Sequence, residues 1–237
     1  MNHPHDLWLR HLKKEKTVTL WGFELTFYDF ISSETLDMTV RDIEEDAQGL
    51  KDLTFNDGDV ILDIGANIGV ISILLAKKFP NTQILAVEPM PHNIENLMLN
   101  AQTNGVTNIQ VVDKALSSIS KTLTLTQSPV NSGSASYLFK EDLFPRFEVP
   151  AMTFDELISS INVPEIALIK MDIEGSEHEV LGRFHQWEKI KRMTIELHAA
   201  YGETPNSSFE RVKKTNRLLE ENLKDRVRIV YEGQKNG

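Results

Sequence analysis

The segment Asp-Ile-Gly-Ala-Asn-Ile-Gly at residues 63–69 constrains the fold more than any other part of the sequence. It lies between an apolar run typical of a buried strand and an apolar run typical of a helix. The chain must reverse there, and Gly65 and Gly69 would let a ligand approach the backbone. In parallel sheets such a loop lies at the carboxyl end of a strand, where nucleotide-like cofactors bind. The segment therefore predicts an α/β fold with a cofactor in this loop.

Short apolar segments alternate with helical ones along most of the chain. VILDIG precedes GVISILLAKKF, QILAVE precedes HNIENLMLNAQTNG, and IQVV follows. After an interruption come IALIKMDIEG, a helical pattern over residues 177–184, and RMTIELHAA. This alternation predicts a doubly wound, mostly parallel sheet with helices on both faces. Near the end, RVRIVYE reads as a last strand after a helix with a single apolar face formed by Phe209, Val212, Leu219 and Leu223.

Three segments stand outside the alternation. Residues 16–30 are rich in β-branched and aromatic side chains around Trp21-Gly22, which predicts a hairpin. Residues 33–53 show helical spacing and predict one or two helices that cover a sheet edge as a lid or cap. Residues 117–150 predict an inserted hairpin beside the sheet, and its loop NSGSAS reads either as a cover over the substrate or as a plain surface loop.

Length and composition limit the organisation and the partners. We expect an N-terminal hairpin and helical cap over residues 1–55 and one cofactor-binding domain over residues 56–237. With 35 acidic and 25 basic residues, the net charge of -10 disfavours nucleic acid as a partner. The absence of cysteine excludes disulfides, thiolate metal sites and cysteine nucleophiles. Residues 1–16 lack the apolar run of a signal peptide or membrane helix, so we expect a cytoplasmic protein without a membrane partner. The oligomeric state is left open.

The glycine loop departs from the dinucleotide pattern G-x-G-x-x-G. Asn67 stands at the middle position, with only Asn67 and Ile68 between Ala66 and Gly69, which weakens the pyrophosphate interpretation. Asparagine tolerates left-handed backbone geometry and offers an amide to a carboxylate or a ribose. That suits the amino-acid end of S-adenosylmethionine.

Acidic residues end the next two strands. Glu88 is placed to accept hydrogen bonds from both ribose hydroxyls of an adenosine, and Pro89 fixes the exit from its strand. Asp113 is placed to reach the adenine amino group, or equally to form a surface turn.

Several motifs together resemble the FkbM family of methyltransferases. They are DIGANIG, VEPMPHNIENLMLN, NSGSAS, MTFDELI and KMDIEGSEHEVL, followed by the acid and histidine of IELHA. The resemblance covers residues 59–199 and implies a class I methyltransferase, Rossmann-like fold that binds S-adenosylmethionine and methylates hydroxyls of small molecules or sugars. By position it assigns cofactor-binding roles to Asp63, Gly65, Asn67, Gly69 and Glu88. Little sequence follows RIVYEG, so either the usual final antiparallel hairpin is short by a strand or the sequence is truncated.

Four polar residues should meet beside the methyl group. Asp172 and Glu174 end the fourth strand, and Glu196 and His198 end the fifth. His198 is a candidate general base because its ordinary pKa lies near neutrality, or else a structural hydrogen-bond donor. Alternatively, the carboxylates and His198 could hold Mg²⁺. Glu177, by contrast, opens the next helix with His178 and Glu179, where acids meet the helix dipole, and we interpret all three as mainly structural.

The sequence therefore predicts an O-methyltransferase that acts on a hydroxyl of a small molecule, natural product or saccharide. The alternatives are an N-methyltransferase and a non-catalytic module that binds S-adenosylmethionine. A more distant alternative is an NAD-dependent oxidoreductase. KMDIEG stands at the fourth strand where amino-group and nucleic-acid methyltransferases carry an Asn-Pro-Pro-aromatic motif, which favours the hydroxyl acceptor.

Overall fold

The computed structural model describes residues 12–127, 135–136, 146–199 and 204–231. Its centre is a six-stranded sheet in which every pair of neighbouring strands is parallel. The strand order is β12 (Val227–Tyr231), β11 (Met193–Leu197), β10 (Leu168–Met171), β3 (Val60–Ile64), β4 (Gln83–Val87) and β5 (Ile109–Val112). The order changes direction between β3 and β10, and their carboxyl ends therefore form the topological switch point. The predicted α/β fold is confirmed.

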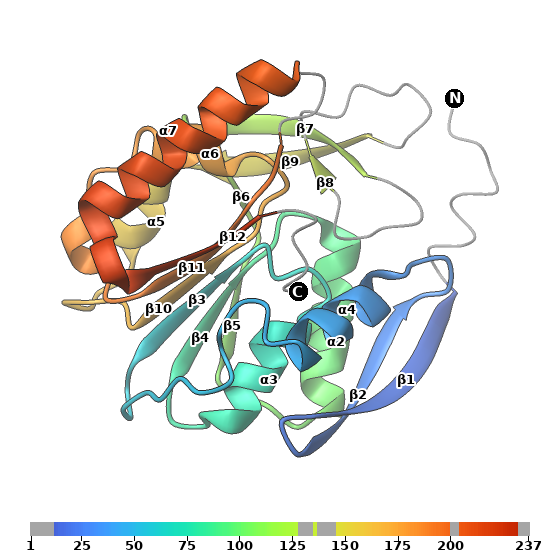
Figure 1. The fold of residues 1–237 in the computed structure, drawn as a ribbon. Helices are drawn as coiled ribbons and strands as arrows, with labels where there is room; N and C mark the ends of the chain where they lie inside the picture. Colours follow the sequence, from blue (N-terminus) through green and yellow to red (C-terminus); the bar gives the residue numbers. More distant parts are fainter. Residues whose placement is uncertain (1–11, 128–134, 137–145, 200–203, 232–237) are drawn as a thin grey trace.

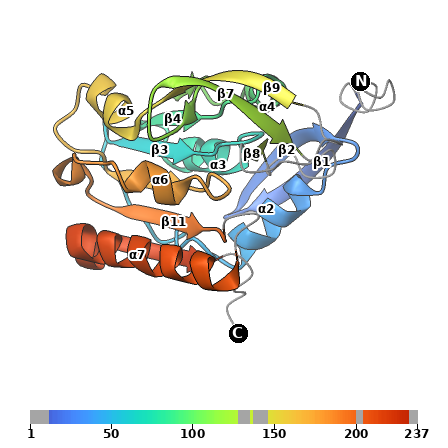
Figure 2. The ribbon, with the colours of Figure 1, turned by 90° about the horizontal axis from the view of Figure 1, so that it is seen from above.

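Helices cover both faces of this sheet (Figure 1). On one face lie α3 (Val70–Lys78) and α4 (Pro91–Thr103), which connect β3, β4 and β5. On the other face lie α5 (Phe154–Ser160), α6 (Glu177–Leu181) and α7 (Pro205–Leu223), as the view from above also shows (Figure 2). β3, β10 and α3 are almost entirely buried, which explains their continuous apolar sequence.

The N-terminal hairpin is confirmed. It consists of β1 (Lys13–Leu20) and β2 (Phe23–Phe30), joined by Trp21 and Gly22, both of which have positive φ as a tight hairpin turn requires. Asn100 of α4 and Asn104, the residue that caps its carboxyl end, lie one helical turn apart. The Asn100 side chain accepts from the Tyr28 amide at 2.7 Å and donates to the Tyr28 carbonyl at 3.1 Å, and Asn104 pairs with Thr26 in the same way. These amides continue the ladder of β2 and fasten its edge to α4.

The segment after the hairpin forms one helix, α2 (Thr35–Glu44). α2 packs against the hairpin and α3, and Leu36 shares a core cluster with Phe27 and Ile73. The contact with the edge strand β12 comes from the turns that follow, where Arg228 donates to the carbonyl of Ala47 at 3.1 Å. The hairpin and α2 thus share one hydrophobic core with the central sheet.

The interruption between β5 and β10 contains the predicted hairpin. β7 (Lys121–Gln127) and β9 (Arg146–Met152) pair antiparallel in a second sheet that also contains β6 (Ala115–Leu116) and β8 (Ala135–Ser136). Most of the NSGSAS loop lies outside the described residues, and its last two residues form β8. Thr153 and Glu156 then form a capping box that begins α5.

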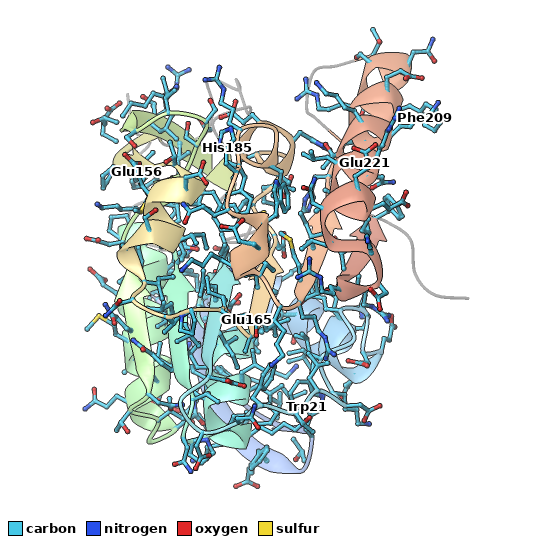
Figure 3. All side chains as sticks on the ribbon, turned by 90° about the vertical axis from the view of Figure 1, so that its left-hand side faces the viewer. Trp21, Glu156, Glu165, His185, Phe209 and Glu221 are labelled. Atoms are coloured by element: carbon cyan, nitrogen blue, oxygen red, sulfur yellow. The ribbon has the colours of Figure 1, made fainter. Side chains whose placement is uncertain are left out.

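One expectation at the C-terminal end needs correction. Phe209 was expected on the apolar face of its helix, but it is 64% exposed and projects from α7 (Figure 3), whereas Leu219 and Leu223 are fully buried. The amino-terminal half of α7 extends past the sheet (Figure 1), and Phe209 belongs to none of the hydrophobic clusters formed by the described residues. The final strand, β12, pairs parallel to β11, and no antiparallel strand joins the central sheet within the described ranges.

Candidate functional site

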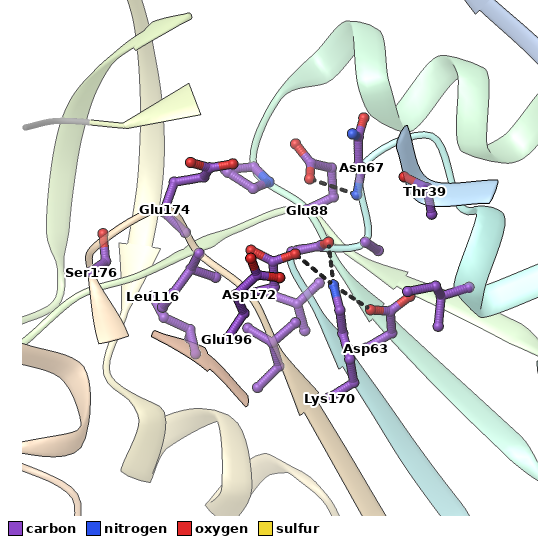
Figure 4. Close-up of a pocket in the computed structure, with 18 of the residues that line it drawn as sticks. Thr39, Asp63, Asn67, Glu88, Leu116, Lys170, Asp172, Glu174, Ser176 and Glu196 are labelled. Atoms are coloured by element: carbon purple, nitrogen blue, oxygen red, sulfur yellow. Dashed lines mark hydrogen bonds and ion pairs between the residues drawn. The ribbon is translucent and has the colours of Figure 1, made fainter. Parts of the chain in front are cut away.

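A pocket of about 260 Å³ opens at the carboxyl ends of the central strands. Ten of the twelve residues predicted for the site line it: Asp63, Gly65, Ala66, Asn67, Glu88, Pro89, Asp172, Glu174, Glu196 and His198. Figure 4 labels six of the ten around this space, with the loop after β3 on one side and the tips of β10 and β11 on the other. Gly69 is buried behind the loop. Asp113 is exposed, and its neighbour Lys114 lines the pocket instead.

The loop after β3 depends on three residues with positive φ. These are Gly65 at 83°, Asn67 at 50° and Gly69 at 88°, so the left-handed conformation expected for Asn67 is confirmed. A Cβ on Gly65 would lie 1.8 Å from the carbonyl oxygen of Asp172, and one on Gly69 would lie 2.8 Å from Cγ of Leu97. Gly65 therefore allows the loop to touch the tip of β10, and Gly69 allows it to pack against α4.

Glu88 faces the pocket from the end of β4 and is held on both carboxylate oxygens. Oε2 accepts from the amide of Asn67 at 2.9 Å, while Oε1 accepts from the amide of Met90 at 2.9 Å and from the Asn93 side chain at 3.1 Å. Burial raises the pKa of Glu88 to about 7, although these donors favour its charged form. The carboxyl group is thus fixed in orientation beside the glycine loop.

A buried lysine, Lys170, joins the loop to β10. Its Nζ donates to the carbonyl of Gly65 at 3.1 Å and lies 3.4 Å from Asp63 and 3.6 Å from Asp172. Asp63 also accepts from the Ser72 hydroxyl at 2.6 Å. Burial lowers the pKa of Lys170, but the attraction of Asp63 and Asp172 outweighs it and raises that pKa above its usual value. Lys170 is therefore a charged group that ties two strand tips together.

The four residues predicted to meet beside the methyl group do converge. Nε2 of His198 lies 3.7 Å from Asp172, 3.9 Å from Glu174 and 3.9 Å from Glu196. β10 ends at Met171, so Asp172 and Glu174 follow the strand and do not belong to it. Instead Glu174, with φ of 55°, turns the chain back toward His198.

The pKa values of His198 and Glu196 in this cluster differ from those of the free side chains. Burial lowers the pKa of His198, but the hydrogen bond that its ring donates to Glu177 and the charges of Asp172 and Glu174 raise it overall, to about 10. Burial and the charge of Asp172 raise the pKa of Glu196 to about 7. When no cation is bound, the surrounding carboxylates therefore favour the doubly protonated form of the His198 ring. The role of His198 as a general base stays a prediction.

Glu177 and Lys170 were not assigned to the site from the sequence. Glu177, interpreted there through the helix dipole, is completely buried: it contacts Nδ1 of His198 at 3.0 Å and accepts from the amide of Ile173 at 2.9 Å. His178 makes structural contacts, with the Thr215 hydroxyl at 2.8 Å and the His198 carbonyl at 2.9 Å. The signal available for Lys170 was a single charge within the apolar strand IALIKMDI.

The remaining wall of the pocket comes from the N-terminal extension and the insert. Thr35, Met38 and Thr39 of α2 contribute to it, together with Leu123 and Leu125 of β7. Within the described ranges, no helix combines the length and apolarity that crossing a membrane requires.

Comparisons with known proteins agree with this arrangement. Residues 63–223 match the family model described as the methyltransferase FkbM domain. The hexuronic acid methyltransferase AglP of Haloferax volcanii is 27% identical over 181 residues, which cover 71% of this chain and 73% of that protein. The 31-O-demethyl-FK506 methyltransferase FkbM of Streptomyces tacrolimicus is 24% identical over 176 residues, covering 61% of this chain and 67% of that protein. A solved fibrillarin/Nop5p complex aligns with 85% of each chain at 16% identity and a TM-score of 0.46. The matched segment contains both the glycine loop and the acid–histidine cluster, and the chain belongs to the FkbM family of methyltransferases.

Proposed function

We propose that this methyltransferase transfers the methyl group of S-adenosylmethionine to a hydroxyl of a small molecule, natural product or saccharide. The observation that supports this most strongly is the shared pocket. Glu88 and the glycine loop face it from β3 and β4, and the cluster around His198 faces it from β10 and β11. A donor held on the first pair of strands would present its methyl group to an acceptor held on the second pair.

The charge of the pocket favours this donor over a dinucleotide. Six carboxylate residues line it, namely Asp42, Asp63, Glu88, Asp172, Glu174 and Glu196, against the basic residues Lys114, Lys170 and His198. S-adenosylmethionine carries a sulfonium and an ammonium group against one carboxylate, whereas NAD carries a pyrophosphate. An excess of carboxylates attracts the first ligand and repels the second.

The proposed contacts of the donor follow from the fixed groups. Glu88 would accept from the ribose hydroxyls, because its orientation is set by Asn67, Met90 and Asn93. The loop from Gly65 to Gly69, with the Asn67 amide, would face the amino-acid end. Ala66 and Pro89 would pack beside the adenosine, and Asp113 keeps its proposed role at the adenine only if its exposed side chain turns inward.

The acceptor would lie between the His198 cluster and the wall formed by α2 and β7. Methyl transfer is a direct displacement, so the hydroxyl must be aligned with the sulfonium methyl and must lose its proton. Asp172, Glu174, Glu196 and His198 supply polar groups for both tasks. A wall with threonine, methionine and leucine side chains suits a compact molecule with both polar and apolar faces. The names of the two relatives, a hexuronic acid methyltransferase and a 31-O-demethyl-FK506 methyltransferase, agree with such acceptors.

The test is a methylation assay on a panel of uronic acids, neutral sugars and hydroxylated macrolides. S-adenosylhomocysteine is quantified by mass spectrometry, and the methylated atom is located by NMR. We expect one added methyl group on an oxygen, with a rate that falls about a hundredfold or more in Asp172→Asn. The surface variant Glu165→Gln should retain the full rate. Methylation of nitrogen would refute the hydroxyl assignment, and equal rates in both variants would refute the role of the cluster.

A further inference from the structure

The most specific unexplained arrangement in the pocket is a set of three ligand-type atoms from two strand tips. One oxygen of Asp172, one oxygen of Glu174 and one ring nitrogen of His198 all lie within 4.8 Å of one another. Around an ion with bonds of about 2.1–2.2 Å, ligand atoms lie about 3 Å apart when adjacent and a little over 4 Å apart when opposite. The observed 3.7 Å and 3.9 Å from Nε2 to the two carboxylates lie between these two separations, so small side-chain rotations would bring the three atoms around one ion.

The orientation of His198 is a second, independent indication. Its side chain is only 6% exposed, and Nδ1 is fixed by the buried carboxylate of Glu177 at 3.0 Å. Nε2 therefore points into the carboxylate cluster, where its distances of 3.7–3.9 Å are longer than a hydrogen bond. A buried imidazole with a carboxylate on one nitrogen and its other nitrogen aimed at acidic groups is the arrangement of metal-binding histidines.

The charges around this point also favour a cation. The carboxylates of Asp172, Glu174 and Glu196 all face the same imidazole nitrogen. Lys170 lies 3.6 Å from Asp172 and also attracts Glu196, but its charge is shared with Asp63 at 3.4 Å. Negative charge is thus concentrated at one point. Three features of the fold place these groups there: the close contact of Gly65 with Asp172, the turn at Glu174, and the contact of Glu177 with His198.

We propose that Asp172, Glu174 and His198 bind a divalent cation, which displaces the proton on Nε2 of His198 into solvent, with Glu177 as the carboxylate that orients the imidazole. The mixed set of two carboxylates and one imidazole fits Mn²⁺ or a similar first-row ion better than Mg²⁺, which prefers oxygen ligands and retains more water. Glu196 lies beside the ion and can hold one of its waters. This deepens the proposed function, on which its role rests: the ion would hold the acceptor oxygen next to the methyl group and promote loss of its proton.

The ion would also bear on substrate choice. An anionic acceptor such as a uronic acid meets a pocket lined by more carboxylates than basic groups. A divalent cation at the cluster would offset this repulsion at the place where the acceptor binds.

The test is a titration of the purified protein with Mn²⁺ alone, followed by electron paramagnetic resonance of the free ion. We expect one saturable site, at least tenfold weaker in Asp172→Asn and His198→Ala, and 10–100-fold weaker in Glu177→Gln. His185→Ala is the matched control, since the exposed His185 also contacts a carboxylate, Asp155, at 2.8 Å (Figure 3), and it should bind Mn²⁺ like the unmodified protein. Glu174→Gln, placed at a turn outside the strands, tests the site if another variant does not fold.

Absence of a saturable site, or equal binding in Asp172→Asn and His185→Ala, would overturn the metal proposal. Calorimetric titration with S-adenosylmethionine on the same samples separates this failure from failure of the proposed function. If the protein binds S-adenosylmethionine but does not bind Mn²⁺, the metal proposal is overturned and the methyltransferase proposal stands. If it binds Mn²⁺ but does not bind S-adenosylmethionine, the methyltransferase proposal is overturned and the metal site stands.

Discussion

Replacing Gly65 by alanine adds one methyl group where the cofactor loop touches the tip of β10. The new Cβ would lie 1.8 Å from the carbonyl oxygen of Asp172, so the two backbones must separate by about 1.5 Å to reach van der Waals contact. That movement breaks the hydrogen bond from Lys170 to the Gly65 carbonyl and strains the one from the Asp172 amide to Ile64. Gly65 is therefore the residue whose small size lets the proposed cofactor loop after β3 pack against Asp172 at the tip of β10.

Gly58 provides a matched control for this substitution. Its φ of 84° equals the 83° of Gly65 within a degree, but a Cβ there would meet nothing within 4 Å. Gly58→Ala should cost only the left-handed strain, about 1 kcal/mol. Gly65→Ala should cost this strain plus the lost hydrogen bonds and the displaced packing, roughly 4 kcal/mol in total.

Urea denaturation followed by circular dichroism measures both free energies of unfolding. The difference of about 3 kcal/mol corresponds to a melting temperature about 10 °C lower for Gly65→Ala than for Gly58→Ala. Gly65→Ala should also bind S-adenosylmethionine more weakly, because the displaced loop carries Asn67. Equal unfolding free energies for the two variants would refute the close contact between the loop and Asp172.

Three further predictions concern buried polar groups. Because the pKa of Glu88 is raised to about 7, its carboxyl group is mainly neutral below that pH and mainly charged above it. The affinity for S-adenosylmethionine, measured by calorimetry, should therefore rise about tenfold from pH 6 to pH 8. In Glu88→Gln this affinity should vary less with pH. Asn100→Ala leaves both backbone groups of Tyr28 unpaired and should lower the free energy of unfolding by about 2–3 kcal/mol, whereas Asn222→Ala, at a helix surface, should change it by less than about 1 kcal/mol. Lys170→Met removes the buried partner of two carboxylates and should lower the free energy of unfolding by about 3–5 kcal/mol. Lys191→Met, which removes a lysine from an exposed ion pair, should lower it by less than about 1 kcal/mol. Similar losses in the two variants would contradict the burial of Lys170.

The central sheet could be predicted because burial on both faces leaves a direct trace in the sequence. The strands at residues 60–64 and 168–171 are wholly buried and therefore read as short apolar runs, and the glycine loop marks the first turn. The N-terminal hairpin and the insert were predictable for a similar local reason, since their turns and alternating patterns lie close together in the chain. Phe209 was misplaced because helical periodicity does not tell where a helix passes beyond its sheet.

The contacts that assemble the site depend on residues far apart in the sequence. Glu177 looks like an ordinary acid at a helix start, and only the packing of α6 against β11 places it on His198, 21 residues away. Lys170 acquires its role from Asp63, which lies in a different strand, β3. Asp113 ends its strand as predicted, yet the turn toward β6 exposes it and brings Lys114 to the pocket. Strand ends predict which residues approach a site but not which way a turn directs each side chain.

The measurement that tests the account most directly is calorimetric titration of the protein with S-adenosylmethionine and, in parallel, with NAD. We predict one binding site for S-adenosylmethionine, an affinity at least tenfold weaker in Glu88→Ala, and no binding of NAD. Binding of NAD in preference to S-adenosylmethionine, or unchanged affinity in Glu88→Ala, would contradict the placement of the methyl donor between the glycine loop and Glu88.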